Sequence, residues 1–135
     1  MDDLSPIGWA LRPLKHYADF RGRAPRAEYW WFVLFVLIAE ILIMVLDSIL
    51  GLNRAVGPYG LLVSLFIFSV IIPHIAVGVR RLHDSDHSGW WLLIGFIPIV
   101  GAITLLVFFS TAGDPESNRY GPDPYGPGDL EEVFA

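Results

Sequence analysis

The chain of 135 residues is unusually apolar: 54% of its residues are hydrophobic, 17% are charged, and the mean hydropathy is +0.53. Its nine basic and fourteen acidic residues give a formal net charge of −5, which argues against a nucleic-acid binder that relies on a basic patch. Because the chain has no cysteine, disulfide frameworks, thiolate zinc sites and iron–sulfur clusters are excluded.

The first 28 residues form a mostly polar segment that precedes the apolar part of the chain. Residues 5–20 are typical of a short amphipathic helix lying in the membrane interface, with Pro6 in its first turn. A frayed polar lead-in is the alternative. The basic residues of the segment are Arg12, Lys15, Arg21, Arg23 and Arg26.

Three apolar stretches, at about residues 29–50, 59–79 and 90–110, are long enough to be transmembrane helices. At ~1.5 Å per residue, roughly 21 residues cover the ~30 Å hydrocarbon core of a bilayer. The second and third stretches contain no Asp, Glu, Lys or Arg, and they lack the polar face that a soluble helix bundle would need. The sequence therefore predicts an all-α integral membrane protein whose three spans make up one domain, residues 29–110.

The basic residues indicate how these spans are threaded. With three crossings, the N-terminal segment and the second loop share one side and contain seven basic residues, whereas Arg54 and Arg119 lie on the other side. The positive-inside rule then places the N-terminus in the cytoplasm and the tail, residues 111–135, outside. This tail is acidic and rich in Pro and Gly, so we expect it to be irregular and disordered.

The second loop is the densest polar cluster. Arg80 and Arg81 come shortly before Trp90 and Trp91, a combination that suits a phospholipid phosphate, with the guanidinium groups on its oxygens and the indole rings at headgroup depth. The alternative is a stop-transfer flank that only fixes topology. His83 and His87 have the i, i+4 spacing of a weak metal-site candidate, but the flanking Ser and Gly residues disfavour a helix there, so no metal ion or other cofactor is expected.

Glu40 and Asp47 are ionisable residues inside the first predicted span, where such residues are functional hypotheses by default. They lie seven residues apart and so on nearly the same helix face. Helix–helix hydrogen bonding between Glu40 and Ser69 is the simpler interpretation, and a proton relay between Glu40 and His74 is the alternative.

Three motifs in this chain resemble those of the domain-of-unknown-function 805 family. They are residues 20–30 (FRGRAPRAEYW), residues 80–84 with 88–91 (RRLHD and SGWW), and residues 118–124 (NRYGPDP). The resemblance implies a small multi-pass protein of the bacterial plasma membrane, the inner membrane, and implies no activity. It also poses a problem, because three crossings would put the third motif on the opposite face from the other two.

The leading functional hypothesis is a noncatalytic membrane protein that organises anionic lipid or a partner protein through a cytoplasmic Arg/Trp face. The residues of that face are Arg21, Arg23, Arg26, Glu28, Arg80, Arg81, His83, Asp84, Trp90 and Trp91. One alternative is a homo-oligomeric transporter or proton-coupled channel built around Glu40. Another is a membrane enzyme acting on lipid headgroups with His83 and Asp84 as acid and base.

Overall fold

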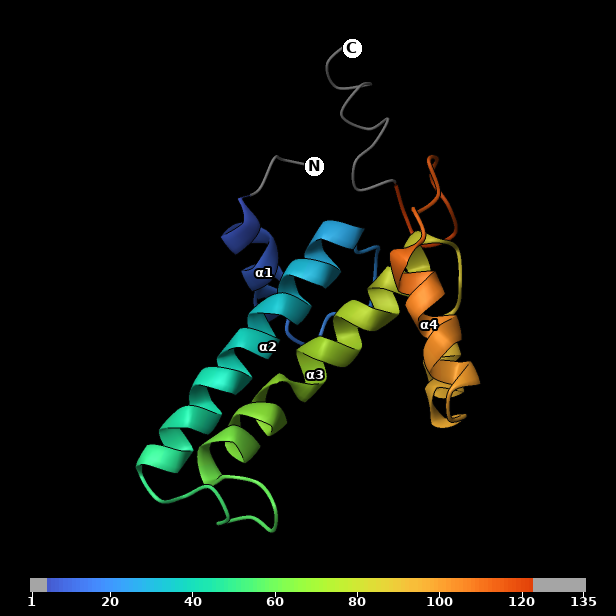
Figure 1. Cartoon of the computed structure of the whole chain (residues 1–135). Coiled ribbons are helices and arrows are strands. Elements are labelled where there is room, and N and C mark those ends of the chain that lie inside the picture. The colour runs from blue at the N-terminus through green and yellow to red at the C-terminus, as the bar shows by residue number, and fades with distance from the viewer. Residues whose placement is uncertain (1–4, 123–135) are drawn as a thin grey trace.

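The computed structural model describes residues 5–122, which form five helices in chain order. They are α1 (Pro6–Lys15), α2 (Arg26–Ile49), α3 (Leu61–Asp84), the 3₁₀ helix η1 (Gly89–Phe96) and α4 (Val100–Ser110). The two long helices, α2 and α3, run antiparallel; α1 packs against α2, and α4 stands beside the C-terminal half of α3 (Figure 1). The all-helical prediction is confirmed for the described residues.

Two of the predicted spans correspond to α2 and α3. Both helices are 24 residues long and apolar enough to cross a membrane. Only 17% and 33% of their most apolar stretches are buried inside the protein, so most of their apolar side chains face outward, as they do on helices surrounded by lipid. Helix α3 continues five residues beyond the predicted end at residue 79, because the charged side chains of its last turn are buried within the protein.

The third predicted span, residues 90–110, is not a single helix. It is divided into η1 and α4, which fold back on each other as a helical hairpin. Trp91 near its beginning and Phe108 near its end have ring centroids 5.5 Å apart. The eleven residues of α4 extend about 16 Å, roughly half of the ~30 Å hydrocarbon core, so neither arm can cross it.

The residues at the tip explain why the helix breaks. Pro98 has no N–H group to continue a helix, and it keeps Ile97 before it in an extended conformation. Ile99 has φ 66° and ψ −65°, and the Val100 N–H donates to the carbonyl of Pro98 at 2.7 Å, which together form a strained γ-turn. Gly101 allows the arms to touch, because a Cβ there would lie 1.7 Å from the carbonyl oxygen of Ile94.

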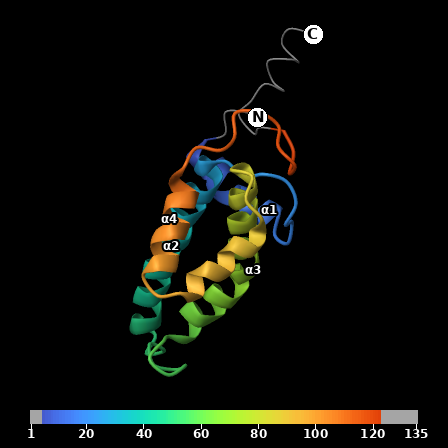
Figure 2. The same cartoon turned by 90° about the vertical axis from the view of Figure 1, so that its right-hand side faces the viewer.

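The hairpin returns residues 111–122 to the end of the bundle where α2 begins and α3 ends (Figures 1 and 2). Arg119 Nε lies 3.1 Å from Asp86 Oδ1 in the loop after α3. Residues 111–122 therefore lie at the same end of the bundle as the N-terminal segment, and not at the far end, where a straight third span would have placed them. Residues 5–28, 80–88 and 111–122 together are called the polar end below.

The expected N-terminal helix is present as α1, although it ends at Lys15 rather than near residue 20. Ser5 Oγ accepts a hydrogen bond from the Gly8 N–H at 3.1 Å, which caps its first turn. Trp9 and Pro13 are buried against the bundle, so α1 is part of the fold. In the tail, residues 111–122 contain no helix, as predicted, but they are held in place by hydrogen bonds, which differs from the predicted disorder. Residues 123–135 lie outside the described part of the chain.

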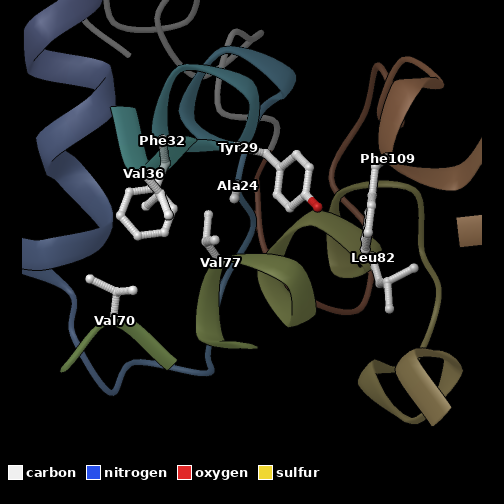
Figure 3. Packing of buried hydrophobic residues seen from close by; sticks show 8 residues of the cluster. All are labelled: Ala24, Tyr29, Phe32, Val36, Val70, Val77, Leu82 and Phe109. Carbon is white, nitrogen blue, oxygen red and sulfur yellow. The ribbon is translucent and has the colours of Figure 1, made fainter. Parts of the chain in front are cut away.

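A small apolar core joins α2, α3 and α4. Its buried members are Ala24, Tyr29, Phe32, Val36, Val70, Val77, Leu82 and Phe109 (Figure 3). The rings of Tyr29 and Phe109 lie 4.5 Å apart, which ties the last turn of α4 to the first turn of α2. The core thus connects α2, α3 and α4 directly beneath the polar end.

Candidate functional site

A buried group of charged side chains lies at the polar end, and we call it the ion-paired cluster. Its members come from the loop before α2, from the first turn of α2 and from the last turn of α3. They are Arg23, Glu28, Arg80, Arg81 and Asp84, all of which are at least 92% buried. Charges this deeply buried persist only when they are paired and hydrogen-bonded.

Asp84 binds two of the arginines. Its Oδ1 lies 2.9 Å from Arg23 Nε, and its Oδ2 lies 2.7 Å from Arg81 Nη1. Asp84 and Arg81 are three residues apart on α3, so the helix itself brings them together, whereas Arg23 reaches across from the preceding loop. The Asp84 carboxylate therefore connects the first two sequence motifs.

Glu28 makes the second connection. Glu28 Oε1 accepts a hydrogen bond of 2.7 Å from Arg80 Nη1, and Glu28 Oε2 lies 3.7 Å from Arg12 Nε in α1. Arg80 Nε also donates to the backbone carbonyl of Asp19 at 3.0 Å. One carboxylate of α2 thus links α1, α3 and the loop between α1 and α2.

The chain after α4 completes the cluster with backbone carbonyls, and one of them belongs to the third motif, because Arg23 Nη1 donates to the carbonyl of Gly121 at 3.3 Å. Arg23 Nη2 donates to the carbonyl of Asp114 at 2.7 Å, and Arg23 Nη1 donates to that of Glu116 at 2.9 Å. Arg81 donates to the carbonyls of Phe109 and Thr111. All three motifs therefore meet at one site, which an odd number of crossings would have prevented.

Small residues allow the tail to approach so closely. A Cβ at Gly113 would lie 2.1 Å from Asp84 Oδ2, so any larger residue there would displace the carboxylate. Asn118 Nδ2 donates to the carbonyl of His83 at 2.9 Å, and the rings of His83 and Tyr120 stack with centroids 3.8 Å apart. The tail is thereby fixed over the last turn of α3.

This arrangement changes the role expected of the arginine face. Arg23, Arg80 and Arg81 bind carboxylates and carbonyls inside the protein, so they are not exposed to a lipid phosphate. Arg21 and Arg26 are exposed, and Arg26 Nη1 contacts the carbonyl of Ser110 at 3.3 Å. Trp90 is 79% exposed at the start of η1 and is not part of the cluster, while Trp91 lies edge-on to Phe108.

The two histidines of the second loop are directed to different neighbours. His83 Nδ1 donates to the carbonyl of Gly22 at 2.9 Å, whereas His87 stacks on Phe108 at 4.4 Å and contacts Ser85. Within residues 5–122 there is no group of three or more His, Asp or Glu side chains arranged to hold a metal ion. Asp84 is occupied by arginines, so the geometry does not favour His83 and Asp84 as an acid–base pair.

Asp47 has a structural role that the sequence did not indicate. Its two carboxylate oxygens accept hydrogen bonds of 3.0 Å from the N–H groups of Leu62 and Val63, at the N-terminus of α3. A carboxylate is favourable there because the first N–H groups of a helix lack partners and the helix dipole is positive. Gly60 provides the space, since a Cβ would lie 2.0 Å from Asp47 Oδ2.

The hydroxyl of Ser69, which the sequence suggested as a hydrogen-bond partner of Glu40, has a partner in its own helix. Ser69 Oγ donates to the carbonyl of Phe66 in its own helix at 2.7 Å, and the carbonyl of Ser69 accepts a hydrogen bond from the Tyr17 hydroxyl. Glu40 is half-buried on α2. The ring of His74 packs 5.6 Å from that of Phe32.

Two concave regions lie beside the ion-paired cluster. A cavity of about 840 Å³, which we call the hairpin cavity, lies between α3 and the η1–α4 hairpin and is lined mainly by apolar and aromatic side chains. An open hollow of about 620 Å³ is lined by residues 15–21, among them Lys15 and Arg21. The sequence did not predict either one. The hairpin cavity combines residues from separate segments, and the hollow depends on the backbone path of the loop after α1, which the residue pattern does not show.

The fold and the site define a small helical membrane protein whose three sequence motifs converge on one buried, ion-paired end. The family model described as "Protein of unknown function (DUF805)" matches residues 17–122, and the chain belongs to this family. It is similar to "Inner membrane protein YhaH" of Escherichia coli (strain K12), with 47% identity over 118 residues, or 87% of this chain and 97% of that protein. It is also similar to "Inner membrane protein YhaI" of the same strain, with 47% identity over 116 residues, or 86% of this chain and 94% of that protein. No solved structure matches the chain.

Proposed function

We propose that this protein is a noncatalytic protein of the bacterial inner membrane that organises anionic phospholipid at its polar end. In this proposal α2 and α3 cross the bilayer, the η1–α4 hairpin enters and leaves it on one side, and the polar end is cytoplasmic. The likeness to two proteins named as inner membrane proteins supports the location.

The distribution of basic residues is the observation that carries the proposal. Eight of the nine basic residues lie in the polar end, and the ninth, Arg54, lies in the loop between α2 and α3. This asymmetry is greater than the seven to two that three crossings would give, because the hairpin moves Arg119 to the same end. By the positive-inside rule, a polar end of this composition faces the cytoplasm.

The hollow lined by residues 15–21 is the part of the polar end best suited to a phosphate group. Lys15 and Arg21 are exposed there, unlike the arginines of the ion-paired cluster. Asp19 also lines it, but its carboxylate accepts the Arg21 backbone N–H at 3.0 Å and lies 3.6 Å from His16 Nδ1. The side chains of Lys15, Asp19 and Arg21 leave one net positive charge, which favours an anionic headgroup over a zwitterionic one.

The direct test measures how many molecules of phosphatidylglycerol the purified protein retains, by native mass spectrometry in mild detergent. Each Lys or Arg near an anionic headgroup contributes about 1 kcal/mol, so Lys15→Ala with Arg21→Ala should weaken binding by about 30-fold. Arg54→Ala, at the other end of the molecule, is the matched control and should leave binding unchanged. Equal retention of phosphatidylglycerol by the double variant and the control would refute the proposal, as would equal retention of phosphatidylethanolamine by the unaltered protein.

One observation favours a second candidate, a homo-oligomeric transporter or proton-coupled channel. Glu40 is half-buried on α2, and His74 on α3 lines the hairpin cavity. Two crossings and a hairpin enclose no pore, so this function requires several copies of the chain. A single-subunit mass in lipid nanodiscs would eliminate it, whereas an oligomer that Glu40→Gln disrupts would favour it over the lipid role.

A further inference from the structure

The hairpin cavity is shaped like a slot that opens to the outside of the bundle. On α3 its lining runs from His74 to His83, nine residues or about 14 Å along the helix axis. Across from α3 it is walled by η1, where Trp90 and Phe96 are largely exposed. A mouth bordered by exposed apolar side chains faces the hydrocarbon region when α2 and α3 span a membrane.

The two ends of the cavity differ in chemistry. His83, Ser88 and Tyr120 line it where it meets the polar end. Ile75 of α3 and Leu93 and Phe96 of η1 line it farther from that end. Its volume of about 840 Å³ lies within the range of about 300–1,000 Å³ that is usual for sites holding small ligands. Rigid aromatic rings form much of the wall, so a bound chain would be held with little loss of side-chain freedom.

Phe20 connects this cavity to the hollow formed by residues 15–21. It lines both of them. Positive charge is therefore on one side of Phe20 and an apolar slot on the other. A molecule with an anionic headgroup and a long apolar chain matches both parts at once.

We propose that the hairpin cavity holds one acyl chain of the anionic phospholipid whose phosphate lies in the hollow at Lys15 and Arg21. This inference rests on the proposed function, because the headgroup contact provides the affinity. Transfer from the bilayer into an apolar cavity yields no hydrophobic gain, since lipid tails are as apolar as the cavity wall. The chain stays in the slot because the headgroup is bound and because the rings pack against it.

The experiment uses the full chain in vesicles of phosphatidylethanolamine that contain a phosphatidylglycerol with a photoactivatable diazirine in one acyl chain. After illumination, peptide mass spectrometry locates the labelled residues. We expect labelling to concentrate in residues 74–79 and 90–96, which line the cavity. Labelling spread evenly over the outward face of α2 would overturn the proposal.

Cavity-filling variants make the test specific. Ile75 lines the cavity and is 45% exposed, whereas Ile71, one turn earlier on the same helix, is 40% exposed and does not line it. Ile75→Trp should abolish labelling of residues 90–96, and Ile71→Trp should not. Leu93→Trp fills the same space from η1 and repeats the test if the first variant fails to fold.

The outcomes distinguish the two proposals. If both filling variants leave the labelling pattern unchanged, the chain does not occupy the cavity, even where phosphatidylglycerol retention still depends on Lys15 and Arg21. If a diazirine-bearing phosphatidylethanolamine labels the cavity equally well and Lys15→Ala with Arg21→Ala has no effect, the proposed function fails instead. If Lys15→Ala with Arg21→Ala and Ile75→Trp each abolish labelling of the cavity, the result supports the lipid-organising function and the acyl-chain site together.

Discussion

Asp84 and Asp86 provide a matched pair for testing the ion-paired cluster. Both are aspartates at the end of α3 or just beyond it, and both bind arginine, but the side chain of Asp84 is 3% exposed and that of Asp86 is 45% exposed. Asp84→Asn would leave Arg23 and Arg81 buried without their shared carboxylate. Breaking a buried pair in this way costs about 3–5 kcal/mol, or two to four powers of ten in the unfolding equilibrium constant.

Asp86→Asn removes only an exposed contact with Arg119, which is worth about 0–1 kcal/mol. The free energy of unfolding of each variant can be measured in dodecyl maltoside micelles by titrating sodium dodecyl sulfate and following tryptophan fluorescence. The two variants should differ by at least about 2 kcal/mol. Equal stability of the two, or a loss below about 1 kcal/mol for Asp84→Asn, would refute the view that the cluster holds the three motifs together.

The same assay tests three further features. Asp47→Ala should destabilise the protein by about 1.5–3 kcal/mol, because the N-terminus of α3 loses the acceptor of two N–H groups. Gly60→Ala should also destabilise it, because the added Cβ would displace the Asp47 carboxylate. Unchanged stability in both variants would contradict the capping role of Asp47. Ile99→Gly should stabilise the protein by about 1–3 kcal/mol, because glycine adopts the positive φ of the turn without strain. Ile97→Gly is the control and should not stabilise it, because Ile97 has a φ of −85°. A loss of stability in Ile99→Gly would count against a strained turn. Gly101→Ala should lower stability by forcing α4 away from η1, and wild-type stability would show that the arms are not in contact.

The sequence predicted the class of protein and its two long helices well, because uninterrupted apolar runs have few other interpretations. It failed at residues 90–110, where length and hydropathy alone suggest another span. The signal for the break was Pro98 with Gly95 and Gly101 on either side, and hydropathy gives these residues little weight. The predicted position of residues 111–122 at the far end of the bundle depended on that third span.

The candidate site, too, could be predicted from the sequence only in part. The sequence placed Arg23, Glu28, Arg80 and Asp84 together on one predicted cytoplasmic face. It could not show that these residues are buried, so the arginines were interpreted as a lipid-facing surface. Burial here depends on the tail, whose carbonyls satisfy the guanidinium groups, and such contacts with the backbone leave no trace in a pattern of side chains.

The central claim is that the hairpin returns the tail to the side of the N-terminal segment, and single cysteines can test it directly because the chain has none of its own. Three exposed positions suit the labelling: Ser5 in the N-terminal segment, Asn53 in the loop between α2 and α3, and Ser117 in the tail. Each would be changed to Cys and treated with a membrane-impermeant maleimide in intact cells and in inverted inner-membrane vesicles. The account predicts that Ser5→Cys and Ser117→Cys react only in inverted vesicles, and Asn53→Cys reacts at the periplasmic face. Labelling of Ser117→Cys together with Asn53→Cys would contradict it and restore a third crossing.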